Sequence, residues 1–233
     1  MTTRLQWFSV TPMREKDIET VHRRFLAEKY SDERGYGVIL QEARRSRLRG
    51  AYVEKAMIKE FIVDPFGKRT VFEIPRYISV GFLLTSEYPG LEIVNSPRSI
   101  GRFLSFLGDC LENRVAIEPI AFGLVAIQAA LKGHTEKVVL QAVSLKDIAL
   151  SGTVSADADI SGTDDVAEFV SQLTGRRRYD YSGARFCVES KGTQYRVEVN
   201  SNGKVKVIAG DASEFARLFR IVMGSVHGKP APE

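Results

Sequence analysis

Residues 69–85, RTVFEIPRYISVGFLLT, form the longest regular pattern in the chain. Large apolar residues occupy positions 72, 74, 78, 80, 82 and 84, and only Arg76 interrupts the alternation. Alternation of this length predicts one long strand with one face against a core. Pro75 cannot donate a ladder hydrogen bond, so we expect a sheet edge or a bulge there. The sequence Asp64-Pro65-Phe66-Gly67 predicts the turn that leads into this strand.

The segments on either side of this strand predict further strands and several helices. The region 36–94 is typical of a β meander, and a helix is expected to open at Thr11-Pro12, with proline at its first position. The apolar segment 122–132 predicts a helix buried on both sides. Runs of strands with interspersed helices favour an α+β fold, with a largely antiparallel sheet or sheets and amphipathic helices packed on one face. Further strands are expected at 4–10, 114–120, 137–143, 153–160, 179–189, 194–200 and 203–208.

A strand–cap–helix unit recurs three times along the chain. Short strands at 91–94, 158–160 and 205–208 each run into a polar cap and then into a helix with a single apolar stripe. This recurrence indicates a possible internal duplication, although α+β chains in general contain such units. Two α+β halves are expected at 1–132 and 133–225, with one continuous domain as the alternative and a disordered tail at 226–233.

The bulk composition limits the class of protein. With 44% apolar and 27% charged residues in 233, the chain is expected to fold rather than to stay disordered. Two distant cysteines exclude a disulfide framework and a zinc site built from cysteine pairs. The N-terminus lacks the apolar stretch of a signal peptide, and the longest apolar run, 117–131, is too short for a bilayer. We therefore expect a soluble cytoplasmic protein without a membrane association.

A cluster of arginines is the first candidate binding site. Four arginines fall within six residues that contain no acidic residue, and the net charge of the chain is +4. In a strand, alternate arginines lie roughly 6.6 Å apart, close to the phosphate repeat of a nucleic-acid strand. Tyr52 could stack on a base. The alternative is an Arg-lined edge strand or hairpin tip that prevents aggregation. The arginines are Arg44, Arg45, Arg47 and Arg49.

A second cluster, Arg176, Arg177 and Arg178, follows the second of the three repeated helices. Cations at a helix C-terminus are stabilised by the helix macrodipole, which explains the cluster without a ligand. The hypothesis of a polyanion-binding surface requires both arginine clusters to share one face of the folded chain.

No recognised catalytic motif or cofactor motif occurs, so an enzyme is not the favoured reading and no cofactor is expected. Asp157, Asp159 and Asp164 could hold a divalent cation, but strand alternation and a helix first turn account for them equally, so no metal site is assigned. The two cysteines were weighed as thiols: Cys110 is expected in the core and Cys187 partly exposed.

The favoured function is therefore a non-catalytic binding protein that contacts nucleic acid through the Arg44–Arg49 region. One alternative is a protein-interaction or assembly subunit, possibly a homo-oligomer, that offers the 69–85 strand as an edge for a partner. A second alternative is a metal-dependent enzyme that uses dispersed carboxylates.

Overall fold

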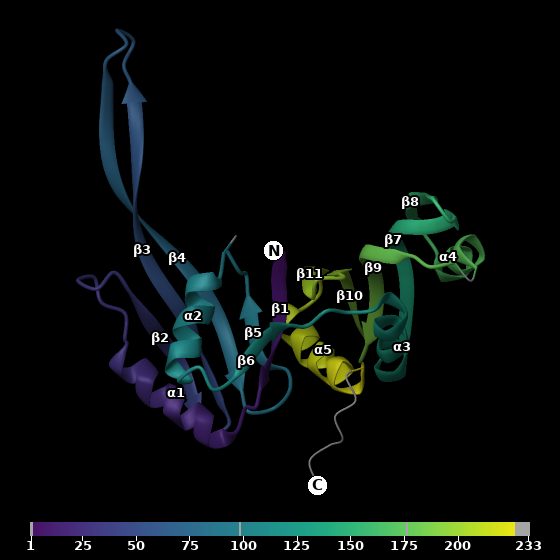
Figure 1. Ribbon diagram of the computed structural model, residues 1–233, viewed down its shortest axis with the longest axis horizontal. Helices are drawn as coiled ribbons and strands as arrows, with labels where there is room; N and C mark the ends of the chain where they lie inside the picture. Colours follow the sequence, from purple (N-terminus) through teal and green to yellow (C-terminus); the bar gives the residue numbers. More distant parts are fainter. Residues whose placement is uncertain (1, 98, 176, 227–233) are drawn as a thin grey trace. The chain divides into compact units, whose positions relative to one another are not determined.

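The computed structural model describes residues 2–97, 99–175 and 177–226 (Figure 1). Within these residues the chain forms an α+β fold of helices and antiparallel ladders, as the sequence predicts. The elements are β1 (Thr3–Thr11), α1 (Glu15–Ala27), β2 (Tyr36–Arg44), β3 (Arg47–Val63), β4 (Arg69–Thr85), β5 (Gly90–Val94), α2 (Gly101–Cys110), β6 (Ala116–Pro119), α3 (Leu124–His134), β7 (Lys137–Ser151), β8 (Val154–Ser161), α4 (Ala167–Thr174), β9 (Asp180–Ser190), β10 (Thr193–Asn200), β11 (Lys204–Ala209) and α5 (Ala212–Val226).

The chain divides into two compact units. One unit is Val10–Ile117, and the other combines the residues up to Ser9 with those from Glu118 onward. This division assigns residues 118–132 to the C-terminal unit, whereas the sequence-based boundary was placed after residue 132. The predicted tail begins at Val226, which is the last residue of α5, and its other residues lie outside the described part of the chain.

The Val10–Ile117 unit is a four-stranded sheet in the order β2-β3-β4-β5. Side chains alternate between its two faces, and one face is covered by α1 and α2. Phe82 of β4 stacks on Phe103 of α2 at 5.3 Å between ring centroids and meets Phe25 of α1 edge-on at 5.5 Å. All three rings are buried, so this aromatic cluster is the centre of the unit's core.

The second unit has the strand order β1-β11-β10-β9-β7-β8, and β6 pairs with β1. Its core lies between the sheet and the helices α3 and α5. Phe219 of α5 stacks on Trp7 of β1 at 4.9 Å and meets Phe122 edge-on at 5.3 Å. Asp211 caps α5, since its carboxylate accepts hydrogen bonds from the backbone N–H groups of Ser213 and Glu214.

The two units share one order of elements, which supports the predicted duplication in a modified form. The first unit is helix, four-stranded meander, helix: α1-β2-β3-β4-β5-α2. The second repeats this order as α3-β7-β9-β10-β11-α5, with β8 and α4 inserted between β7 and β9. Two features therefore have no counterpart in the other unit: the extension of β3 and β4, and the β8–α4 insertion.

Two local predictions are wrong. Helix α3 is buried on one side only, through Leu124, Ile127 and Leu131, while Val125 is 69% exposed. Its alanines made the helix look apolar on every side, but an alanine is small enough to face solvent at little cost. Helix α1 begins at Glu15 rather than at Pro12, because the backbone N–H of Arg14 donates to the Asp17 carboxylate at 2.8 Å and completes the first turn.

None of the helices in the described part of the chain combines the length and the apolar character needed to span a bilayer.

Candidate functional site

The arginine cluster lies at a tight hairpin between β2 and β3. Arg44 and Arg47 are direct cross-strand partners, and Arg45 with Ser46 forms the turn between them. Arg49 continues along β3 on the same face as Arg47, two residues further on. Arg45 therefore lies at a hairpin tip and does not belong to a row of alternate arginines along one strand.

Three of these arginines are paired with carboxylates. Arg44 Nε lies 2.6 Å from the Glu42 carboxylate, which accepts a hydrogen bond from Arg47 Nη2 at 2.7 Å, and Arg45 Nε lies 2.7 Å from the Glu15 carboxylate. The hydrogen bond from Arg47 holds the pKa of Glu42 below its ordinary value, so this carboxylate stays ionised at neutral pH. Glu42 lies on β2, two residues before Arg44, whereas Glu15 comes from α1 and is distant from the cluster in sequence.

Tyr52 belongs to the core. It is 5% exposed, and its ring lies 5.6 Å from Phe103 and 5.1 Å from Phe106, both on α2. Its hydroxyl donates to Glu54 at 3.0 Å, and burial raises the pKa of the phenol. Through these two ring contacts the buried Tyr52 stabilises the packing of α2 on the sheet.

The second arginine cluster belongs to the other unit. Arg177 and Arg178 are exposed beyond the end of α4, and Arg177 Nη1 donates to the Leu173 carbonyl at 3.0 Å. A cation that donates to a carbonyl of the last helical turn is stabilised by the helix macrodipole, as the sequence predicts for this cluster. Arg176 lies outside the described residues. The idea that the two clusters share one surface stays a prediction.

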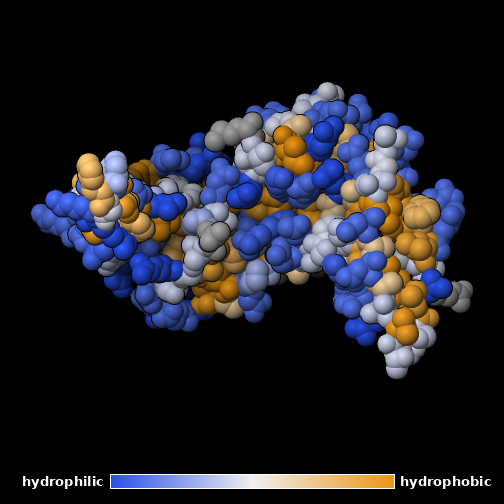
Figure 2. All heavy atoms as spheres, turned by 90° about the horizontal axis from the view of Figure 1, so that it is seen from above, coloured by the Kyte–Doolittle hydropathy of each residue, from blue (hydrophilic) through white to orange (hydrophobic). Residues whose placement is uncertain are grey.

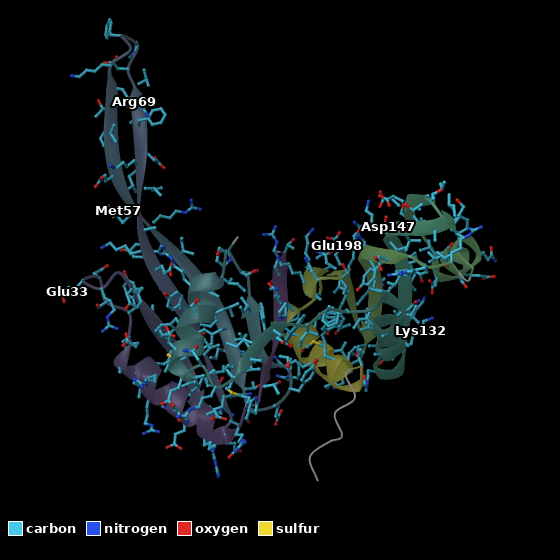
Figure 3. All side chains as sticks on the ribbon, viewed as in Figure 1. Glu33, Met57, Arg69, Lys132, Asp147 and Glu198 are labelled. Atoms are coloured by element: carbon cyan, nitrogen blue, oxygen red, sulfur yellow. The ribbon has the colours of Figure 1, made fainter. Side chains whose placement is uncertain are left out.

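Strands β3 and β4 extend well past the sheet and form a two-stranded arm. Pairing of β3 with β2 ends at Glu54, and pairing of β4 with β5 covers only Gly81 to Leu84. Between Ala56–Val63 and Arg69–Arg76 the two strands therefore pair only with each other in the described part of the chain. In Figure 3 Met57 marks the place where the strands leave the sheet, and Arg69 lies further out along the arm.

The arm carries an unusual concentration of exposed apolar side chains. More than half of the large apolar residues that are exposed in the described residues lie between positions 57 and 77. In Figure 2, orange apolar groups lie among blue hydrophilic ones at the left-hand end, where the arm projects. Exposed apolar side chains gathered in this way mark interaction sites. These residues are Met57, Phe61, Ile62, Val63, Phe66, Val71, Phe72, Ile74 and Tyr77.

Both faces of the arm are apolar. Cross-strand pairing places Phe61 opposite Val71 on one face, and Ile58 opposite Ile74 on the other. The second face continues the row that enters the core at Val80 and Phe82, but no helix covers it along the arm. The long apolar alternation of β4 is therefore half-buried, as predicted, only in its C-terminal part.

Polar contacts hold the two strands of the arm together. The Asp64 carboxylate accepts from the backbone N–H groups of Phe66 and Lys68 at 2.9 and 2.8 Å, which fixes the predicted turn. Lys59 Nζ lies 3.5 Å from the Glu73 carboxylate, and the guanidinium of Arg69 lies 3.8 Å from the ring centroid of Phe61. An isolated two-stranded ribbon is marginally stable in water, and these contacts favour its order.

Asp157, one of the three carboxylates named as candidate metal ligands, serves other contacts. Asp157 accepts from Lys146 Nζ at 2.7 Å and from the backbone N–H of Asp147 at 3.1 Å, and the Lys146 contact lowers the pKa of Asp157. In the described ranges, no three His, Cys, Asp or Glu side chains come together in a way that could hold a metal ion.

The buried thiol is unsuited to nucleophilic chemistry. Cys110 lies in the core as predicted, and burial raises the pKa of its thiol to about 11. Only the thiolate is a good nucleophile, so this side chain is inert at neutral pH. Cys187 is partly exposed on β9, as the strand alternation predicts.

Comparison with known proteins adds no relative to this picture. No family model matches the chain, and no curated protein matches it either. The functional argument therefore rests on the geometry of the arm and of the two sheets.

Proposed function

We propose that this protein is a non-catalytic assembly subunit that docks through the β3–β4 arm, and that the docking partner is a second copy of the same chain. The observation that carries the proposal is the concentration of exposed apolar side chains on both faces of the arm. The two strands of the arm pair only with each other in the described residues and add no strand to the sheet. Covering such side chains removes apolar surface from water at roughly 25 cal/mol per Å².

The order of elements that the two units share supports the view that the arm is an addition to the fold. The hairpin that corresponds to β3–β4 in the second unit is β9–β10, whose strands have 11 and 8 residues. Strands β3 and β4 have 17 residues each. Strands β9 and β10 complete their sheet without such an extension. The extra length of β3 and β4 is therefore available for a role outside the sheet.

The charges of the arm favour a protein partner over a polyanion. Between residues 55 and 77, carboxylates at Glu60, Asp64 and Glu73 are interspersed with the cations, so no continuous basic stripe forms. A phosphate backbone requires such a stripe, whereas five cations and three carboxylates give a mixed surface of small net charge that repels a copy of itself only weakly.

One face of the arm is also self-complementary. Lys59 and Glu73 lie directly opposite each other on the face that carries Phe61. A two-fold axis running along the ribbon would place Lys59 of one copy over Glu73 of the other while the apolar residues meet. Isologous contacts of this kind close into dimers.

Sedimentation velocity over a concentration series tests the proposal. We expect the wild-type chain to dimerise with little dependence on salt, because the contact is mainly apolar. The double variant Phe61→Ser/Val71→Ser, which removes a cross-strand pair on the face that carries Lys59 and Glu73, should weaken dimerisation by about a hundredfold or more. Phe169→Ser is the matched control, since Phe169 on α4 is 56% exposed against 55% for Phe61. A wild-type chain that stays monomeric throughout would refute a second copy as the partner.

A charge exchange tests the register. Lys59→Glu and Glu73→Lys should each weaken dimerisation by placing like charges together, and the combined variant should restore it. Failure of the combined variant to recover would refute this arrangement of the two arms.

The nucleic-acid hypothesis for Arg44, Arg45, Arg47 and Arg49 stays a prediction. Exposed ion pairs contribute little and a phosphate could replace their carboxylates, so the pairing of three of these arginines does not decide the matter. Salt titration of binding to a generic oligonucleotide is its test, and no binding at low salt would refute it.

A further inference from the structure

The β8–α4 insertion of the second unit builds a polar cavity on the face of the sheet opposite α3 and α5. After β7 the chain forms β8 and then a turn at residues 161–165, which leads into α4. The last residue of β8, Ser161, lies opposite Ala142 of β7, and Ala142 lies opposite Arg185 of β9. The turn is thereby placed beside the exposed side chains of β9 and β10.

Three hydrogen bonds fix the turn to β7. The backbone N–H groups of Gly162 and Val166 donate to the carbonyls of Gln141 and Leu140, both at 2.9 Å. The backbone N–H of Leu140 donates in turn to the Asp165 carboxylate at 3.3 Å. Gln141 is the residue at which the β7–β9 register shifts, so a bulge provides the carbonyl that holds the turn.

A row of charged side chains crosses the same face of the sheet. Arg185 lies opposite Glu198 of β10, and Glu198 lies opposite Lys206 of β11. The Glu198 carboxylate accepts from Arg185 Nη2 at 2.8 Å and from Lys206 Nζ at 3.1 Å, which fixes the position of Arg185 (Figure 3 labels Glu198). The Nη1 group of Arg185 takes no part in these bonds and keeps its N–H donors for a ligand.

Arg196 completes the set of donors. It lies opposite Cys187 on the same face, diagonal to Arg185, within reach of a shared ligand. Both arginines are exposed, but unlike Arg185, Arg196 makes no ion pair with a described carboxylate. A cavity of about 520 Å³ lies between these groups, and no acidic residue lines it. Its lining residues are Gln141, Ser161, Gly162, Thr163, Arg185 and Arg196.

We propose that this cavity binds an oxyanion of the phosphate class. Two guanidinium groups supply charge and paired N–H donors, a geometry that suits phosphate oxygens. The hydroxyls of Ser161 and Thr163 and the Gln141 amide supply neutral donors around them. The ligand is a phosphate monoester or free phosphate in one case and a phosphodiester of a nucleic acid in the other. The proposal does not depend on the arm.

Isothermal titration calorimetry of the full chain with inorganic phosphate, at low salt and neutral pH, is the first test. We expect saturable binding that Arg196→Gln weakens about tenfold or more, because a charge-assisted contact is lost. Thr163→Ala should weaken it by a smaller factor. Arg217→Gln is the matched control, because Arg217 is an exposed arginine on α5, on the helix side of the sheet. The affinity of the Arg217→Gln variant for phosphate should match that of the wild type.

Fluorescence anisotropy with a labelled single-stranded oligonucleotide separates the two sources of phosphate. Oligonucleotide binding that depends on Arg196 and is displaced by phosphate assigns a phosphodiester. Phosphate binding that depends on Arg196, without oligonucleotide binding, assigns a small phosphate compound. The proposal is overturned if neither ligand binds, or if Arg196→Gln and Arg217→Gln change the affinity equally.

Discussion

Met57 and Pro75 are direct cross-strand partners in the arm, and the register of β3 and β4 continues past this pair without a bulge. Pro75 has no N–H to donate, so an undisturbed ladder requires that the missing donor face the outer edge of β4. This confirms the edge that the sequence predicted at Pro75. It also means that the free edge of β4 is interrupted at this residue, as is common where a protein limits edge-to-edge pairing.

Replacing Pro75 should remove this protection. Pro75→Thr restores an N–H on the outer edge, so we expect additional strand pairing between chains and the appearance of large assemblies at high protein concentration. Light scattering during incubation measures this. Val71→Thr is the control, since residue 71 faces the same side as residue 75 and already has its N–H. Equal scattering from both variants would contradict a protective role for Pro75.

The stability of the fold should be insensitive to the arm and sensitive to the core beside it. Phe82 is 2% exposed between Phe25 and Phe103, so Phe82→Ala should lower the free energy of unfolding by about 3–5 kcal/mol. Phe61→Ala, on the exposed arm, should change it by about 0.5 kcal/mol or less. Urea unfolding at a protein concentration that keeps the chain monomeric measures both. A large loss for Phe61→Ala would show that the arm packs within its own monomer.

The fold class could be predicted from the sequence because it depends on local patterns. Alternation predicts β4, and the apolar stripes of α2, α4 and α5 recur with the period of a helix. What the pattern of β4 could not show is that its N-terminal half has no helix above it. Alternation reports that one face is apolar, and it carries no information on whether another element covers that face.

The candidate sites depend on residues that are distant in sequence, and for this reason they were missed or misjudged. Glu15 pairs with Arg45 from α1, and Tyr52 is buried by a helix that begins about fifty residues later. Arg185 and Arg196 come together only through the register of β9 and β10. A useful signal is present in the segment 193–206, where charged residues alternate with buried valines, but this alternation identifies a face of the sheet and not a cavity.

Two glycines in hairpin turns should differ in their tolerance of a side chain. Gly203 and Gly192 both have positive φ, +79° and +71°, which costs an L-residue about 1–2 kcal/mol. A Cβ at Gly203 would also lie 1.7 Å from the Ile120 carbonyl oxygen, whereas nothing lies within 4 Å at Gly192. Gly203→Ala should therefore lower the melting temperature much more than Gly192→Ala. Equal shifts in thermal unfolding would contradict the close approach of residue 120 to this turn.

The Arg185–Glu198–Lys206 network should make a pH-dependent contribution to stability. Burial alone would raise the pKa of Glu198, but the hydrogen bonds from Arg185 and Lys206 outweigh it, and the pKa lies below its ordinary value. A lowered pKa in the folded state gives stability that is present above the unfolded pKa, about 4.3, and is lost as the pH falls through the folded pKa. Glu198 is partly exposed, so the contribution should be about 1 kcal/mol or less after solvent screening. Thermal unfolding of the wild type and of Glu198→Gln should therefore differ at pH 7 and converge in strong acid. A difference that stays constant down to pH 2 would show that the substitution acts through packing and not through the charge of the carboxylate.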